Sequence, residues 1–98
     1  MKILAIEHEN PGIEPGLYAQ FRRAEAIRAW ELYQSGLIRE LYFRQDRSEA
    51  VLVLECESEE EAREVLQSLP LVQAGLIDFE LIPLVAYPGF GRLFATEG

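Results

Sequence analysis

The first candidate for acid–base chemistry in this sequence is its single histidine. His8 directly follows an apolar run at residues 2–7, which predicts a first strand. Because a histidine side chain gives and takes protons near neutral pH, His8 is a candidate general base or acid. Two other interpretations stay open: an exposed residue at a strand end, or a haem ligand, for which the chain offers no supporting motif.

Carboxylates form a second candidate group. Glu55, Asp78 and Glu80 fall on one face of two predicted strands, since alternate strand residues face opposite sides. Carboxylates crowded in an apolar cavity hold protons tightly, which suits acid–base work or a divalent metal. The alternative is salt bridging to Arg39 or Arg44, within the chain or across a dimer. Because metal-ligand spacings, phosphate loops and nucleophile motifs are missing, we expect no metal and no cofactor.

The first predicted helix, residues 17–35, places an arginine among aromatic and small residues. At 100° per residue, one broad face collects Tyr18, Ala26, Ala29, Trp30 and Tyr33. Arg22 lies in the middle of that face, where it would meet an anionic ligand in a helix–sheet cavity. The alternatives are an arginine that snorkels to solvent or pairs with Glu25. We expect Trp30 and Tyr33 to pack in the core rather than to form a ligand cage.

The predicted elements follow the order βαββαβ. The helix at 17–35 contains no Gly or Pro and ends at Gly36, a C-cap residue. A second helix begins at Ser58, with Glu61 as its capping-box partner, and stops at Pro70. Strands are expected at residues 2–7, 37–44, 50–56 and 77–84. This order predicts an α+β, ferredoxin-like fold, with a four-stranded antiparallel sheet and two helices on one face.

Strand alternation predicts which side chains the helices cover. Leu52, Leu54 and Cys56 should face the helices, because the residue just before a capped helix normally lies beneath it. Pro83, near the end of the last strand, indicates an edge strand or the exit of the chain from the sheet. The strand at 37–44 is expected to place four residues on the opposite face: Ile38, Glu40, Tyr42 and Arg44. That face is half apolar and half charged, which fits a partner sheet or a ligand better than water.

Three stretches of the chain share their order and spacing with a known family. They are Gly36-Leu37-Ile38-Arg39-Glu40-Leu41-Tyr42, then Leu69-Pro70-Leu71, then Asp78-Phe79-Glu80-Leu81 followed by Leu84 and Tyr87-Pro88. Together they resemble the muconolactone isomerase-like group of dimeric α+β barrels. Glu40 and Ala86-Tyr87 stand where those isomerases carry basic residues that could bind an acidic lactone.

The resemblance implies a homodimer in which two sheets pack about a two-fold axis, with cavities between helix and sheet or inside the barrel. We therefore expect a small-molecule-binding protein, isomerase-like, that uses acid–base proton transfer on a small organic acid or lactone. The alternative is a non-catalytic binding or structural homodimer. The candidate proton-transfer residues are His8, Glu55 and Glu80, and the candidate ligand-binding residues are Arg22, Arg39 and Tyr42.

Composition narrows the partners. The 98 residues fit one domain, and a net charge of −8 with a pI of about 4.6 disfavours nucleic acid and anionic membranes. The single cysteine, Cys56, excludes an internal disulfide and is expected in the core. Without a signal-like or membrane-spanning run, we expect a cytoplasmic protein. Aromatic residues in the tail at 87–98 predict that it docks on the dimer.

Overall fold

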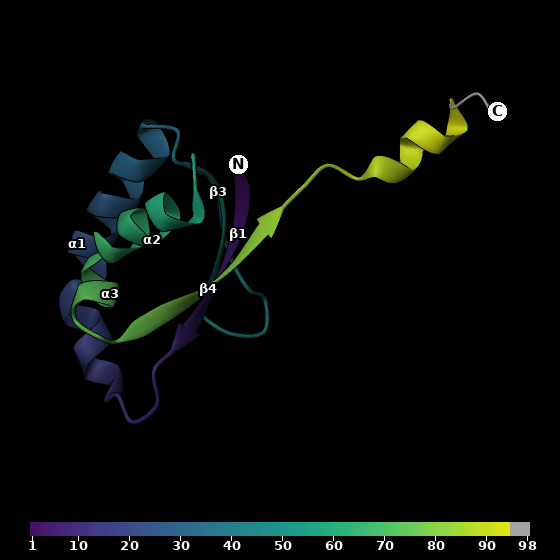
Figure 1. Cartoon of the computed structure of the whole chain (residues 1–98). Helices are drawn as coiled ribbons and strands as arrows, with labels where there is room; N and C mark the ends of the chain where they lie inside the picture. The colour runs from purple at the N-terminus through teal and green to yellow at the C-terminus, as the bar shows by residue number, and fades with distance from the viewer. Residues whose placement is uncertain (95–98) are drawn as a thin grey trace.

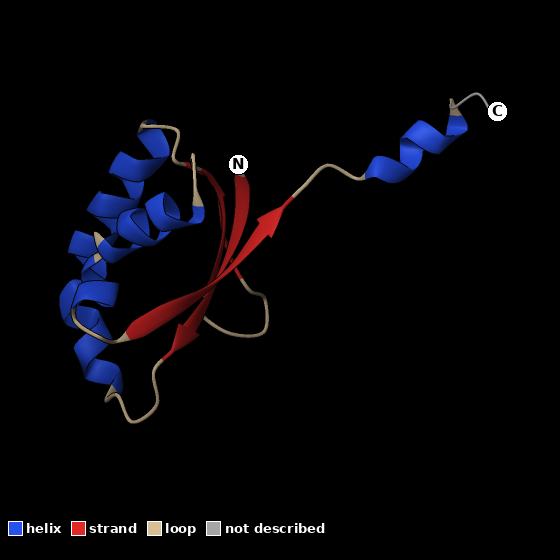
Figure 2. Cartoon of the chain, in the orientation of Figure 1, coloured by secondary structure: helices blue, strands red, loops and turns tan. Residues whose placement is uncertain are grey.

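The strands and helices form two layers, and the computed structural model describes residues 1–94. The strands are β1 (Lys2–Glu9), β2 (Ile38–Phe43), β3 (Ala50–Glu55) and β4 (Ile77–Leu84). The helices are α1 (Pro15–Gln34), α2 (Glu59–Gln67) and α3 (Pro70–Gln73). The sheet is antiparallel with the order β2-β3-β1-β4, and these helices cover one of its faces (Figures 1 and 2). The predicted ferredoxin-like fold is confirmed.

The predicted segments are present with small shifts. β4 has the expected bounds and is an edge strand, as Pro83 indicated, while β1 runs on to Glu9. α1 begins at Pro15, before the expected residue 17, because the fixed φ of proline suits the first helical turn. Pro70 ends the α2 region as predicted, but it also begins the short helix α3.

Local hydrogen bonds fix the ends of the helices. The Ser58 side chain accepts the Glu61 amide at 3.1 Å, as predicted for the N-cap of α2. The return bond differs from the prediction, because Glu61 Oε1 accepts the amide of Glu57 at 3.4 Å and not that of Ser58. Gly36 has a φ of +86°, the left-handed conformation expected of a residue that ends a helix.

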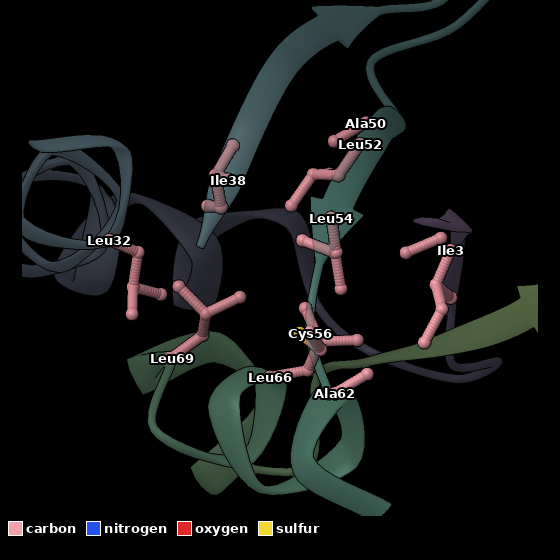
Figure 3. Close-up of a cluster of buried hydrophobic side chains, with 11 residues drawn as sticks. Ile3, Leu32, Ile38, Ala50, Leu52, Leu54, Cys56, Ala62, Leu66 and Leu69 are labelled. Carbon is pink, nitrogen blue, oxygen red and sulfur yellow. The ribbon is translucent and has the colours of Figure 1, made fainter. Parts of the chain in front are cut away.

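The hydrophobic core lies between α2 and the sheet. Leu52, Leu54 and Cys56 are 2%, 0% and 4% exposed, so the predicted register of β3 is confirmed. Figure 3 shows these side chains meeting residues of α1, α2, the neighbouring strands and the segment before α3. The cluster also contains Ile3, Ala5, Leu32, Ile38, Ala50, Ala62, Leu66 and Leu69.

The sequence prediction for Ile38 is wrong. Simple alternation placed Ile38 on the same face as Glu40, yet its side chain is 1% exposed and lies in the core. The register explains this, because Ile38 pairs with Leu54 whereas Glu40 pairs with the adjacent Val53. This irregularity in β2 places one extra residue, Arg39, between them and inverts the alternation beyond it. Leu41 and Phe43 therefore face the helix-covered side of the sheet, with their strand partners Leu52 and Ala50.

α1 is packed loosely against the sheet. Leu32 is its only buried residue, and α1 contacts mainly α3 and β2. Trp30 and Tyr33 are 57% and 50% exposed, so the prediction that they pack in the core is wrong. They stack on each other instead, with ring centroids 5.7 Å apart. The small side chains of Ala26 and Ala29 do not fill the space between α1 and the sheet.

The face of the sheet that the helices leave open has an apolar centre and a charged margin. The half-buried apolar residues of this face are Leu4, Ile6, Val51, Val53 and Ile82. Figure 2 shows that no helix of the described chain covers this face. His8 and charged side chains surround the centre, among them Lys2, Glu55 and Glu80.

The chain after β4 leaves the body of the domain. Figure 1 shows the 3₁₀ helix η1 (Pro88–Leu93) extending away from the sheet and helices. The large apolar side chains of residues 87–94 are exposed: Tyr87, Phe90, Leu93 and Phe94. The last part of the tail that the sequence analysis assigned to docking, residues 95–98, lies outside the described residues. Among the described helices, none has both the length and the apolarity to cross a membrane.

Candidate functional site

A cavity of about 910 Å³ lies between α1 and the helix-covered face of the sheet. The sheet contributes Glu7, Ile38, Leu41, Phe43, Ala50, Leu52 and Phe79 to its wall. α1 contributes a stripe at helical spacing: Pro15, Tyr18, Arg22, Glu25, Ala26, Ala29, Trp30 and Tyr33. The helix face proposed from the sequence therefore exists, and it faces a cavity rather than a packed core.

Glu7 is the buried acid of this cavity. It continues the inward alternation of Ile3 and Ala5 along β1, and only 7% of it is exposed. The backbone amide of Ala50 donates to Glu7 Oε1 at 3.1 Å. Burial raises the pKa of Glu7 to about 7, against the lowering effect of the Ala50 hydrogen bond. Glu7 thus exchanges its proton in the range where a general base works best.

Glu25 is a second carboxylate on the cavity wall. Its Oε1 accepts the backbone amide of Leu71 at 2.9 Å, an amide in the first turn of α3 that has no partner within its helix. Burial raises the pKa of Glu25, while this hydrogen bond opposes the rise. Glu7 and Glu25 therefore approach the cavity from sheet and helix, each with one oxygen fixed by the main chain.

Arg22 is the basic side chain of the cavity. Within residues 1–94 it forms no ion pair, and Glu25, its alternative partner in the sequence analysis, bonds to Leu71 instead. Tyr18, one turn earlier on α1, donates its hydroxyl to the Leu76 carbonyl at 3.3 Å. Arg22 is exposed, as in the alternative of an arginine that snorkels to solvent, but it still lines the cavity. An arginine at this wall suits the binding of a carboxylate or an enolate oxygen.

Contacts of Glu49 hold the β2–β3 turn near the Glu7 end of the cavity. Ser48 of this turn lines the cavity. Glu49 is 7% exposed, and its Oε2 accepts the Glu9 amide at 2.9 Å. Its Oε1 lies 3.9 Å from Arg44 Nη1 and 3.6 Å from Arg47 Nη1. The Glu49 charge also raises the pKa of Glu7, although less than burial does.

The structure brings together only part of the proton-transfer group proposed from the sequence. His8 Nε2 lies 3.5 Å from Glu80 Oε1, and both side chains are exposed on the open face of the sheet. Glu55 lies on the same face, but its Oε2 pairs with the N-terminal ammonium at 2.7 Å. Along β1, Glu55 is opposite Lys2 and Glu80 is opposite Ile6, so they are roughly 13 Å apart along the strand direction, with β1 between them.

Of the proposed ligand-binding residues, Arg22 alone contributes to the cavity wall. Arg39 Nε donates to the Gly36 carbonyl at 2.7 Å and so fastens the turn between α1 and β2. The Tyr42 hydroxyl donates to Glu40 at 2.8 Å on the open face. The ligand-binding roles proposed for Arg39 and Tyr42 stay predictions.

Sequence reasoning missed Glu7 as a candidate, although a signal for it exists. The alternation of Ile3 and Ala5 places the next inward position at Glu7, and an acid at such a position is unusual. His8, one residue later, points to the opposite face because alternate side chains of a strand diverge. Within the described residues, no group of three or more His, Cys, Asp or Glu side chains is arranged to hold a metal ion.

The family of the chain follows from comparison with known proteins. The model of the muconolactone delta-isomerase family matches residues 5–89. The chain belongs to the muconolactone delta-isomerase family. This confirms the resemblance found in the sequence. No curated protein sequence gives a significant match.

Solved structures of two enzymes share the fold of this family member. Muconolactone isomerase is 23% identical, with a TM-score of 0.74 over 90% of this chain and 92% of that chain. The 5-chloro-2-hydroxyhydroquinone dehydrochlorinase of Burkholderia phenoliruptrix, in complex with 2,5-dihydroxybenzoquinone, is 17% identical. Its TM-score is 0.72 over 91% of this chain and 98% of that chain. At these identities the structures establish the common fold.

Proposed function

We propose that this protein is an enzyme that isomerises a small organic acid or lactone by proton transfer in the cavity beneath α1. The observation that carries the proposal is Glu7, a buried carboxyl group on the cavity wall with a pKa of about 7. Membership of the muconolactone delta-isomerase family supports the same class of reaction. The substrate of that family, as its name states, is a lactone.

Glu7 is proposed as the general base. Its Oε1 is held by the Ala50 amide, which leaves Oε2 to take a proton from the carbon next to the substrate carbonyl. The electron pair of the broken C–H bond moves into the ring and places negative charge on the carbonyl oxygen. Because a pKa near 7 makes both protonation states accessible at neutral pH, Glu7 can remove the proton and return one.

Arg22 and Glu25 are proposed to complete the site. Arg22 brings a positive charge that stabilises the developing enolate or holds a carboxylate of the substrate. Glu25 approaches from the helix side and offers a second carboxyl group that can donate a proton at another carbon. The new C–H bond uses the electron pair of the enolate, so the double bond shifts without any oxidant or reductant.

The test of this function is proton exchange. The purified full chain is incubated in D₂O with muconolactone and with related unsaturated lactones and acids, and deuterium uptake is followed by proton NMR. Glu7→Gln should lose exchange, whereas Glu64→Gln, a change in an exposed acid of α2, should retain it. Equal exchange by both variants would reject Glu7 as the base. A panel without any exchange would favour the non-catalytic alternative.

The same assay tests the hypothesis that the sequence suggested for His8. His8→Gln removes the only imidazole and its contact with Glu80 while it leaves the cavity intact. If His8→Gln abolishes exchange and Glu7→Gln retains it, the reaction takes place on the open face of the sheet. The roles proposed for His8, Glu80 and Glu55 would then replace those of the cavity residues.

We also propose that the protein associates with itself. The apolar centre of the open face, with Leu4, Ile6 and Val53, is surrounded by charges of both signs, as at an interface between two copies. The exposed tail offers further apolar surface that its own domain does not cover (Figure 1). Self-association would bury both surfaces, whether the dimer is catalytic or purely structural.

A further inference from the structure

The cavity is longer than a small acid requires. Its lining follows α1 from Pro15 to Tyr33, which corresponds to about 27 Å of helix axis. Its volume of about 910 Å³ is near the upper end of the roughly 300–1,000 Å³ range of pockets that bury drug-sized ligands. A small lactone placed against Glu7 would therefore leave most of this space unfilled.

The charged and apolar groups of the cavity are separated along its length. The first turns of α1 bring Tyr18 and Arg22 to the end of β1, where Glu7 and Glu9 lie. The far half of the cavity is apolar, and its wall consists of Ala29, Trp30, Ile38, Leu41, Leu52 and Leu69. A ligand that fits both halves has an acidic head and an apolar body.

The apolar half offers flat surfaces. Trp30 and Tyr33 are stacked with an angle of 27° between their rings, yet about half of each remains exposed. Ala26 and Ala29 lack the bulk to fill the adjoining space. A planar ring placed against Trp30 and over these alanines would cover aromatic surface that the chain itself leaves open.

We propose that the substrate is an amphipathic carboxylate or acidic lactone whose body contains one or two flat apolar rings. Its acidic head lies near Glu7 and Arg22, and its rings lie in the half of the cavity bounded by Trp30 and Leu41. The inference rests on the proposed function for the position of the head. Trp30 and Ala29 are then the residues that determine specificity for the body.

The test is a binding series by isothermal titration calorimetry with butyrate, phenylacetate and 2-naphthylacetate. Affinity should rise by roughly tenfold or more for each ring, because buried apolar area adds to binding. The heat-capacity change should become more negative along the series. Trp30→Ala changes an exposed side chain and should weaken 2-naphthylacetate by about tenfold while it leaves butyrate unchanged. Ala29→Trp should exclude the naphthyl ring by filling its place.

Four outcomes would overturn the inference. Affinities that are independent of ring number, or a Trp30→Ala protein with unchanged binding of 2-naphthylacetate, would mean that the apolar half does not receive the ligand. If truncation after Pro88 strengthens the binding of 2-naphthylacetate, the tail of a partner copy occupies the apolar half of the cavity in the full chain. Equal affinity for neutral 2-methylnaphthalene would show that the cavity does not recognise an acidic head group.

The proposed function can fail separately from this inference. Glu7→Gln should still bind 2-naphthylacetate, since Arg22 and the apolar half are unchanged, while it loses proton exchange. If Glu7→Gln retains exchange and binding still depends on ring number, the specificity proposal stands and the role of Glu7 is rejected. If exchange depends on Glu7 but binding does not depend on ring number, the role of Glu7 stands and the specificity proposal is rejected.

Discussion

The main-chain amide of Ala50 donates to Oε1 of Glu7 at 3.1 Å and connects β3 to an acid inside the cavity wall. A protonated and an ionised carboxyl group can each accept this bond, but burial disfavours the ionised form alone. The charges of Glu49, Glu9 and Glu25 act in the same direction as burial. The hydrogen bond therefore fixes the position of the Glu7 side chain, and the burial and charges around Glu7 determine the pH at which it ionises.

This environment predicts how Glu7→Gln changes stability with pH. The pKa of Glu7 is about 7 in the folded protein against 4.5 without these surroundings, so the unfolded chain ionises first as pH rises. The folded protein therefore loses stability between about pH 4.5 and 7, and the loss is complete above that range. Glutamine can still accept the Ala50 bond but never ionises. Glu7→Gln should be more stable than the wild type by about 3 kcal/mol at pH 8.

Urea unfolding at pH 4 and pH 8, at one protein concentration, measures this difference. Near pH 4 the two proteins should be almost equally stable, because Glu7 is then protonated in both the folded and the unfolded wild type. Glu64→Gln changes an exposed acid and should show no such pH-dependent gain. A Glu7→Gln protein that loses stability at pH 8 would contradict the assignment of a buried, proton-binding Glu7.

The rate of proton exchange should follow the ionised fraction of Glu7. Because a base must be deprotonated to remove a proton, kcat/KM for an exchanging substrate should rise with pH and level off above about pH 7. Glu25 also has a raised pKa, and Glu25→Gln should change the protonation step at the second carbon without abolishing proton removal. A rate that is flat from pH 5 to 8 would contradict the proposal for Glu7.

The sequence predicted the elements and the core of β3 well because both depend on local patterns. Leu52, Leu54 and Cys56 alternate beneath a helix whose start Ser58 marks, and all are buried as expected. Ile38 was misplaced because an irregularity in strand pairing depends on the partner strand, and a single-strand pattern does not contain it.

The candidate site was harder to predict, since it depends on how tightly α1 packs. The spacing of Arg22 with Trp30 predicted one helix face correctly, but a core and a cavity use the same spacing. The position of the Glu25 carboxyl group depends on its hydrogen bond from the amide of Leu71, which is 46 positions away in the sequence. Such a contact exists only once α3 has taken its place, so local sequence gives little signal for it.

The N-cap of α2 gives a prediction on stability. Ser58→Ala removes the acceptor of the Glu61 amide and should lower the free energy of unfolding by about 1 kcal/mol. Ser58→Thr keeps a hydroxyl acceptor and should lose far less. Thermal unfolding by circular dichroism would distinguish the two variants. Equal losses would show that the side-chain bond does not hold the start of this helix.

The last prediction concerns the tail, whose side chains pack mainly on each other. The Tyr87 and Phe90 rings meet edge to face with centroids 5.0 Å apart, and the Tyr87 ring covers Gly89. Even so, Tyr87, Phe90 and Phe94 are 65%, 67% and 83% exposed. Since full burial of one such side chain contributes roughly 1.5–3 kcal/mol, the isolated chain forgoes several kcal/mol here.

A second copy of the chain can bury what the first leaves exposed. Figure 1 shows the tail directed away from its own helices, so folding back on them would require a different path after Leu84. We therefore expect truncation after Pro88 to weaken self-association by at least about tenfold in sedimentation equilibrium, because it removes Phe90 and Phe94 from the contact. Phe90→Ala should give part of this loss, and Arg92→Gln, an exposed polar change in the same segment, should give little. A truncated chain with an unchanged association constant, or a full chain that stays monomeric at high micromolar concentration, would show that the tail does not join two copies.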